Sequence, residues 1–477
     1  MNKTLALLII VFSFANCKEK TKFFETVTQY ENKTNIIYIL ADDLGYADIG
    51  CYGQKDIKTP HIDSMAKEGM KFTDHYAGSA VCGPSRASLL TGMDTGHSYI
   101  RGNDPIPETF PLRPEDVTVA EMLKKSGYYT GIIGKWGLGD PETTGTPNKQ
   151  GFDYFYGYLN HIRAHNSYPD YLWRNNEKVM LPNEIIMAEK GYAKGLGSVS
   201  TNKALYSNDL FTEEALGFIE TNANSDKPFF LYLAYTIPHA NNEFWLLEEN
   251  KHGMEVPDVE KYKNENWPEV EKAKASAITR LDNYVGEVLK MIKSKGIEEN
   301  TLVIFASDNG PHAEGEVDPE FFDSNKPFKG LKRDLYEGGV RVPFIAWWPK
   351  TIKPSTTSKH VSAFWDFMPT CADIAGIKLD CPTNGISYLP TLLSQTEKQK
   401  NHDFLYWEFP AQGNKQAVRK GNWKLVYLHK ADTYELYDLN NEIEEQTNVI
   451  KEHPKVFEDL KNIMINGRTP SKEFPLN

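Results

Sequence analysis

Four apolar, β-rich runs constrain the fold of this 477-residue chain more than any other feature. They span residues 35–41, 128–134, 228–238 and 301–307, and polar or charged residues follow each of them directly. Near-continuous apolar strands, in contrast to alternating ones, are typical of a sheet that is covered on both faces. The sequence therefore predicts an α/β protein with a mostly parallel sheet.

Helical patterns separate these strands. Thr118 and Glu121 form a capping box that opens a short amphipathic helix, and Gly127 ends it just before the second strand. Apolar residues over 278–292 keep helical spacing until Gly296, and the fourth strand follows. This alternation predicts a large doubly wound sheet, in which ligands bind beyond the carboxyl ends of the strands.

The pattern changes after about residue 380. Short runs typical of antiparallel strands occupy 403–409, 416–428 and 434–439, and an amphipathic helix follows at 456–463. We therefore expect a main domain at residues 33–390 and a smaller C-terminal α+β subdomain with an antiparallel sheet at residues 391–477.

The N-terminus resembles a targeting segment. Lys3 precedes an apolar run at 5–14 that is too short to span a bilayer, and a plausible cleavage site lies before Cys17. Residues 1–17 therefore predict a signal peptide, with Cys17 as the lipid-bearing residue of a bacterial lipoprotein. Residues 18–32 would form a polar tether. We expect an exported protein at the cell surface or in the periplasm, held to the membrane only by this lipid; plain secretion is the alternative.

Charge and cysteine content limit the partners further. A net charge of -12 argues against a nucleic-acid binder, which usually carries a basic face. A polyanionic substrate would need a local cluster of cations. An exported compartment permits a disulfide, and Cys371 with Cys381 is the nearest pair; free buried thiols are the alternative.

Two pairs of oxygen-bearing residues follow strands that are far apart in sequence. Asp42 and Asp43 follow the first strand, and Asp308 and Asn309 follow the fourth. Oxygen-only ligands favour Ca²⁺ or Mg²⁺ over Zn²⁺ or copper. Each pair alone is also compatible with a helix cap or a turn. Together, at two strand ends of one sheet, they predict a metal site.

Cys82 precedes a Pro-Ser helix start, where backbone N–H groups and the helix dipole favour an anion. Arg86 adds a cation one turn later. These residues indicate an activated cysteine nucleophile or an anion pocket. The alternative is a small apolar cysteine packed at a helix start.

The run at 82–92 resembles the signature of the type I sulfatases, in the alkaline-phosphatase-like superfamily, where a maturation enzyme converts the cysteine to formylglycine. The resemblance extends over nearly the whole mature chain, through residues 41–45, 134–136, 307–310, 336–343 and 435–439. It implies a sulfatase catalytic domain at residues 33–390 that hydrolyses a sulfate ester on a carbohydrate.

The resemblance also implies roles for single residues. The ligands of Ca²⁺, which is favoured over Mg²⁺, would be the formylglycine at Cys82 and four further residues: Asp42, Asp43, Asp308 and Asn309. Arg86 would help to hold one hydroxyl of the formylglycine hydrate as an alkoxide. Lys135 and Lys332 would hold the sulfate, and His239 would protonate the leaving oxygen. The chemistry needs a divalent cation, fixed positive charges and a near-neutral acid.

One position departs from the family pattern. Many members have a histidine two residues after the first lysine, as the base that expels sulfate, and here that position is Gly137. Another base must take over, and His161, His165 and His312 are the candidates. As a hypothesis, His165 or His312 contacts the formylglycine or the sugar.

The insert at residues 145–208 is rich in aromatic residues, namely Tyr154, Phe155, Tyr156, Tyr158, Tyr168, Tyr171 and Trp173. They are compatible with a sugar-binding wall and equally with packing of the insert on the main domain. The insert resembles a subset of sulfatases that act on galactose-type sugars. The alternatives to a sulfatase are a formylglycine-dependent phosphonate or phosphodiester hydrolase, a non-catalytic glycan-binding lipoprotein, and a cysteine hydrolase with a free thiolate at Cys82.

Overall fold

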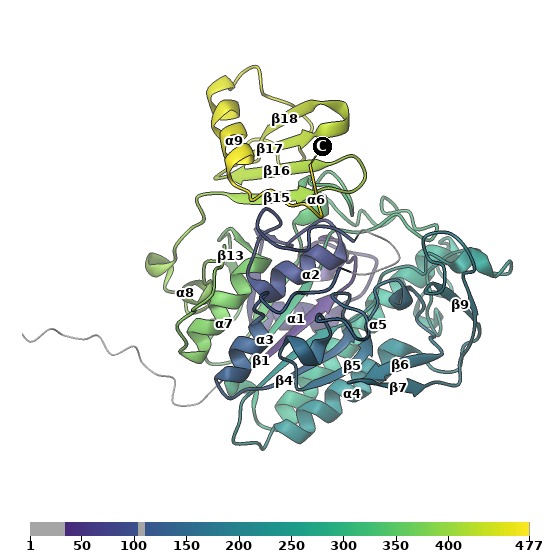
Figure 1. Cartoon of the computed structure of the whole chain (residues 1–477). Coiled ribbons are helices and arrows are strands. Elements are labelled where there is room, and N and C mark those ends of the chain that lie inside the picture. The colour runs from purple at the N-terminus through teal and green to yellow at the C-terminus, as the bar shows by residue number, and fades with distance from the viewer. Residues whose placement is uncertain (1–33, 104–109, 477) are drawn as a thin grey trace, which may run out of the picture.

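The computed structural model describes residues 34–103 and 110–476. The predicted signal peptide and tether lie outside the described residues. A ten-stranded mixed sheet forms the centre of the main domain (Figure 1), in the spatial order β13, β2, β12, β11, β1, β10, β4, β5, β6, β7. In chain order its strands are β1 (Asn35–Ala41), β2 (Met70–Phe72), β4 (Tyr129–Lys135), β5 (Tyr154–Tyr158), β6 (Tyr171–Arg174), β7 (Glu177–Met180), β10 (Phe229–Ala234), β11 (Thr301–Ser307), β12 (Phe344–Trp347) and β13 (Thr356–Ser358).

The five central strands, β11, β1, β10, β4 and β5, pair in parallel. They include all four predicted strands, so the prediction of a mostly parallel centre is confirmed. Antiparallel strands extend the sheet at both sides, β12 next to β11 and β6 next to β5. Two small sheets, β3 (His75–Tyr76) with β14 (Ser362–Ala363) and β8 (Glu184–Met187) with β9 (Ser198–Asn202), lie outside it.

Helices cover both faces of the sheet, as the apolar strands predict. Alternate residues of β1 point to opposite cores: Ile37 and Ile39 belong to one, and Ile36 and Tyr38 to the other. The first core contains residues of α1 (Pro60–Glu68), α4 (Ser207–Asn222) and α5 (Glu269–Ser294). The second contains residues of α2 (Cys82–Thr91), α3 (Val119–Lys125), α7 (Phe367–Ala375) and α8 (Leu389–Leu392). The capping box of Thr118 and Glu121 at the start of α3 is present.

The C-terminal region forms a separate four-stranded antiparallel sheet with one helix across it (Figure 1). Its elements are β15 (Leu405–Phe409), β16 (Lys415–Lys420), β17 (Trp423–Leu428), β18 (Thr433–Asp438) and α9 (Pro454–Asn466). The run predicted at 416–428 is therefore a hairpin of two strands. The sheet packs on the main domain through a shared apolar cluster that includes Trp407 and Trp365.

A buried ion pair also joins the two parts, because Lys424 of β17 donates to Glu337 at the start of α6 (Glu337–Val340), at 2.8 Å. The domain boundary at residues 390 and 391 stays a prediction. Cys371 and Cys381 are free thiols, as are the other two described cysteines, in line with the alternative to a disulfide. Within the described ranges, no helix has the length and apolar character needed to cross a membrane.

Candidate active site

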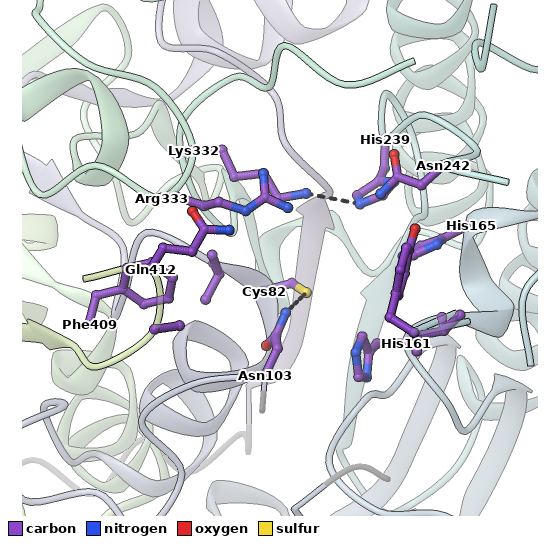
Figure 2. A pocket seen from close by; sticks show the side chains of 14 residues that line it. Cys82, Asn103, His161, His165, His239, Asn242, Lys332, Arg333, Phe409 and Gln412 are labelled. Atoms are coloured by element: carbon purple, nitrogen blue, oxygen red, sulfur yellow. Dashed lines mark hydrogen bonds between the residues drawn. The ribbon is translucent and has the colours of Figure 1, made fainter. Parts of the chain in front are cut away.

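Cys82 lies at the first position of α2, where the chain changes from the extended backbone of Val81 to a helix. The side chain is 3% exposed. Asn103 holds this helix start from both sides: its Nδ2 donates to Cys82 Sγ at 3.4 Å, and its Oδ1 accepts from the Gly83 N–H at 3.0 Å (Figure 2). The sulfur thus lies at the positive end of a helix, as predicted.

Arg86, one turn along α2, is fully buried and fixed by three hydrogen bonds. Its Nε and Nη2 donate to Oδ2 of Asp308 at 3.0 and 2.8 Å, and its Nη1 donates to the carbonyl of Lys135 at 2.8 Å. Ser85 ties the same helix to the end of β11 by donating to the Asp308 carbonyl at 2.6 Å. Helix α2 is therefore locked to the carboxyl edge of the sheet.

The register of β1 and β11 brings the four predicted oxygen ligands together. Ala41 pairs with Ser307, so Asp42–Asp43 and Asp308–Asn309 leave the sheet side by side. Asp43 has a left-handed backbone, with φ of 66°, a conformation that costs a non-glycine residue energy and is common at functional sites. Its N–H donates to Asp308 Oδ1 at 3.1 Å, and its Oδ1 accepts from Asn309 Nδ2 at 2.7 Å.

These residues fit a hard divalent cation. The Oδ1 atoms of Asp42 and Asn309 are buried and have no hydrogen-bond partner among the residues that the structure describes, and a buried oxygen without a partner is costly. Burial, and then the adjacent Asp42 carboxylate, raise the pKa of Asp308 to about 7 against the opposing charge of Arg86. A cation bound to these oxygens would satisfy them and favour the ionised carboxylates.

Two buried lysines balance the acidic pair after β1. Lys135, at the end of β4, donates to Asp42 Oδ2 at 2.7 Å. Lys332 donates to Asp43 Oδ2 at 2.8 Å and to Glu314 Oε2 at 3.0 Å. Burial lowers the pKa of Lys332, but Asp43 and Glu314 outweigh it and hold this pKa above its usual value. Both lysines are therefore cations.

His239 lies after β10 and contacts Lys332. Its Nδ1 is 2.6 Å from the Ala240 carbonyl, so Nδ1 carries the proton, and its Nε2 accepts from Lys332 Nζ at 3.0 Å (Figure 2). Burial, and then the Lys332 charge, hold the pKa of His239 well below its usual value. The imidazole is neutral in this arrangement, and Lys332 is the proton donor next to it.

The three candidate histidines occupy different surroundings. His165, in the short helix η3 (Arg163–His165), stacks on His239 with ring centroids 4.9 Å apart, and its Nδ1 is 3.0 Å from Glu243 Oε2. His312 bonds to backbone at both nitrogens, with Pro238 O at 3.0 Å from Nε2 and the Glu314 N–H at 3.0 Å from Nδ1. Their predicted contacts with a substrate stay predictions, and for His312 these bonds favour a structural role.

A pocket of about 360 Å³ opens above Cys82, a volume at the lower end of the range for ligand sites. Of the predicted site residues, Cys82, His165, His239 and Lys332 line it, together with His161. Lys135 and Arg86 do not line it; they lie beneath it, in contact with Asp42 and Asp308. The carboxyl edge of the sheet therefore carries one site, as the strand ends predict.

Several lining residues were not predicted from the sequence: Asn103, Tyr192, Asn242, Arg333, Phe409 and Gln412. Arg333 pairs with Glu314. It comes nearest in this set to having a sequence signal, because it directly follows the predicted Lys332. Phe409 is the last residue of β15 and Gln412 lies in the connection to β16, so the C-terminal sheet forms one wall of the pocket. None of the seven aromatic residues predicted as a possible sugar wall lines it, in line with the packing alternative.

The fold and site define an α/β protein with a cation-lined pocket at the carboxyl edge of its sheet, an arrangement suited to an anionic substrate. A family model described as Sulfatase matches residues 34–377, and one described as N-sulphoglucosamine sulphohydrolase, C-terminal, matches residues 329–469. The chain belongs to the sulfatase family, in the alkaline-phosphatase-like superfamily, and is a sulfuric ester hydrolase.

Relatives of known type align over nearly the whole chain. The chain is 29% identical to an N-acetylgalactosamine-6-O-sulfatase of Bacteroides thetaiotaomicron, over 98% of this chain and 99% of that protein. It is 31% identical to the N-acetylgalactosamine-6-sulfatase of Rattus norvegicus, over 93% and 81%. Among solved structures, that of Ps i-CgsB superposes with a TM-score of 0.77 at 28% identity, over 93% of this chain and 94% of the other.

Proposed function

We propose that this protein is a carbohydrate sulfatase that removes a sulfate ester from a galactose-type sugar, with N-acetylgalactosamine 6-sulfate as the first candidate. One observation carries the proposal: Cys82, Lys332 and Arg333 meet in a single pocket at the start of a helix, directly above a buried set of carboxylates. The printed activities of the Bacteroides and rat relatives support the choice of sugar.

We further propose that Cys82 acts after conversion to formylglycine, and that Asp42, Asp43, Asp308 and Asn309 hold Ca²⁺. When present, formylglycine supplies a hydroxyl nucleophile and the calcium ion supplies positive charge beside it. The partnerless Oδ1 atoms of Asp42 and Asn309 support the cation. The fit of the 82–92 run to the type I signature supports the modification.

The remaining residues would bind the sulfate group and move a proton. Lys332 and Arg333 line the pocket, and their charges would pair with the sulfuryl oxygens. His239 and Lys332 share a hydrogen bond at 3.0 Å. Either Lys332 or His239 would therefore deliver the proton to the leaving sugar oxygen. If His239 is the donor, its neutral imidazole would first take this proton from Lys332. Lys135 would keep Asp42 ionised beneath the site.

The test is sulfate release from a set of matched esters. N-acetylgalactosamine 6-sulfate, its 4-sulfate isomer, galactose 6-sulfate and the corresponding phosphate esters would be offered to enzyme matured by a formylglycine-generating partner. We expect release from a 6-sulfate. Faster turnover of phosphate esters would instead favour the phosphonate or phosphodiester hydrolase. No turnover of any ester by fully modified protein would favour the glycan-binding lipoprotein.

Export is a separate proposal. In residues 1–17, Lys3 is followed by an apolar run and then by Cys17. This pattern supports a lipoprotein at the cell surface or in the periplasm. Labelling cells with a fatty acid that carries a detectable tag should mark the full-length chain and not a Cys17→Ala variant. Labelling that survives the substitution would exclude Cys17 as the lipid site.

A further inference from the structure

The pocket must supply a base as well as an acid. If the proposed function holds, cleavage of the sugar leaves sulfate on the residue at 82, and its release requires a proton to leave the remaining hydroxyl. Among the described residues that line the pocket, the side chains that can act as a neutral base are three histidines, His161, His165 and His239. Lys332 and Arg333 are cations in ion pairs and are unsuited to take up a proton.

Two of these histidines, His165 and His239, form a stacked pair, and His239 contacts Lys332. His239 gives its Nδ1 proton to the Ala240 carbonyl and directs its Nε2 to Lys332. His165 stacks on His239 and bonds Glu243 through Nδ1, which places it with the group that protonates the leaving sugar oxygen. In the view of Figure 2, all three histidines lie on one side of Cys82, and His161 lies apart from His165 and His239. One group must protonate the leaving sugar oxygen and another must take a proton from residue 82, so the acid and the base need separate positions.

The sheet brings His161 next to Gly137. Strands β4 and β5 run in parallel, and their pairing continues past both ends, where the Trp136 N–H donates to Tyr158 O at 3.0 Å and the Gly137 N–H donates to Leu159 O at 2.9 Å. A Cβ atom placed on Gly137 would lie 3.4 Å from the Cβ of His161. The His161 side chain therefore starts in van der Waals contact with the place from which a side chain at position 137 would start.

The turn that carries His161 is fixed by Asn160. The Asn160 Oδ1 accepts from the Ile162 N–H at 2.8 Å, and its Nδ2 donates to Asp140 Oδ1 at 2.9 Å. His161 is buried at the pocket wall. Burial, and then Lys135, lower its pKa to about 3, so the ring is neutral; a sulfate anion bound in the pocket would offset the nearby positive charge and strengthen the base.

We propose that His161 is the base that completes turnover, from a different strand than the family pattern uses. In this step the proton of the remaining hydroxyl on residue 82 moves to a ring nitrogen of His161. The O–H electron pair forms the C=O bond of the aldehyde, and the C–O bond to sulfate breaks with its pair on the departing sulfate. Addition of water to the aldehyde restores the hydrate, and His161 returns its proton to solvent.

The first test is the variant His161→Ala, with His161→Asn as a second variant that keeps a polar side chain of similar reach. Removal of a positioned base costs about 10²–10⁴-fold in rate, so we expect kcat for sulfate release to fall by that factor. The first desulfated sugar should still appear as a rapid burst of one equivalent per enzyme. Intact-protein mass spectrometry during turnover should then find the enzyme carrying one additional sulfuryl group, a readout that does not depend on the steady-state rate.

The second test restores the base at the neighbouring position. In Gly137→His/His161→Ala the new ring would start beside the vacated one, and histidine tolerates the left-handed backbone of Gly137, φ 77°, better than most residues. We expect kcat of this double variant to exceed that of His161→Ala by at least about tenfold, a modest part of the 10²–10⁴-fold contribution of a general base. Gly137→Ala/His161→Ala is the matched control, with the same backbone demand and no imidazole, and should not recover.

The outcomes separate this inference from the proposed function. Equal formylglycine content and equal melting temperatures in wild type and variants, measured beforehand, show that maturation and folding are intact. A wild-type protein without sulfatase activity would refute the proposed function itself. With an active wild type, a His161→Ala or His161→Asn variant that turns over normally, or that slows without burst and without sulfated protein, would overturn the role of His161.

Discussion

Replacing Arg86 with alanine should destabilise the protein strongly, because this guanidinium is the main counter-charge of the buried Asp308 carboxylate and also lies near that of Asp42. It makes two hydrogen bonds to Asp308, at 3.0 and 2.8 Å, and lies 3.6 Å from Asp42. Removing one partner of a buried ion pair costs about 3–5 kcal/mol. Arg86→Lys keeps the charge but cannot make all three bonds, so we expect a smaller cost of about 1–3 kcal/mol, as for unsatisfied buried groups.

The cost should also grow with pH. In the folded protein the pKa of Asp308 is raised to about 7, above its value of about 3.9 in an unfolded chain. Between these values the folded state binds a proton that the unfolded state has lost, so stability falls as the pH rises through that window. Removing Arg86 takes away the largest effect that lowers this pKa, so in the variant the fall continues above about pH 7.

Urea unfolding followed by tryptophan fluorescence, in EDTA and at about pH 6 and about pH 9, measures both effects, because a change of midpoint at constant slope reports a change in stability. We expect Arg86→Ala to lose more stability than Arg86→Lys, and to lose more at the higher pH. A loss below about 1 kcal/mol, the size of an exposed ion pair, would refute the account of Arg86. So would a loss that is independent of pH.

Three further predictions address the cation, the acid and the pocket wall. Calcium at about one hundred times its Kd should raise the free energy of unfolding by about 2.7 kcal/mol, and Asp42→Asn should abolish most of this shift in calorimetry; an unchanged shift would exclude Asp42 as a ligand. Lys332→Met should raise the pKa of His239, because the ammonium lowers it, but should move the alkaline fall of kcat/KM to lower pH and lower its maximum, because His239 alone loses its proton at lower pH than the Lys332 ammonium that supplies it in the wild type; an unmoved profile would contradict the Lys332–His239 pair. Gln412→Ala should raise KM by about 5- to 10-fold, the effect of one lost hydrogen bond of about 1 kcal/mol, with kcat nearly unchanged; an unaltered KM would remove the C-terminal wall from substrate binding.

The central strands and the strand-end residues were predictable because local pattern decides them. Apolar runs that are buried on both faces must pair within a covered sheet, and parallel pairing then brings Asp42 and Asp308 to one edge. The capping box at Thr118 and the helix that ends before Gly296 follow from similarly local signals. A turn over residues 421–422 splits the run at 416–428 into two strands, and the predicted single run missed it although Gly421 stands at that turn.

Other parts of the site depend on long-range packing and leave little trace in the sequence. Asn103 reaches Cys82 across a loop, and Phe409 reaches the pocket only because the C-terminal sheet docks through Trp407. The neutral state of His239 follows from a carbonyl and an ammonium that meet it in space. The sequence favoured His165 and His312 over His161, and the continued pairing of β4 and β5 is what brings His161 next to Gly137.

The central claim is that the residue at position 82 is an aldehyde formed from cysteine. The most direct measurement is mass spectrometry of the proteolytic peptide that contains Cys82, from protein produced in its native host or with a formylglycine-generating enzyme. The account predicts the aldehyde or its hydrate at this position in most of the protein. An unmodified cysteine, in a preparation where a control sulfatase is fully converted, would contradict it.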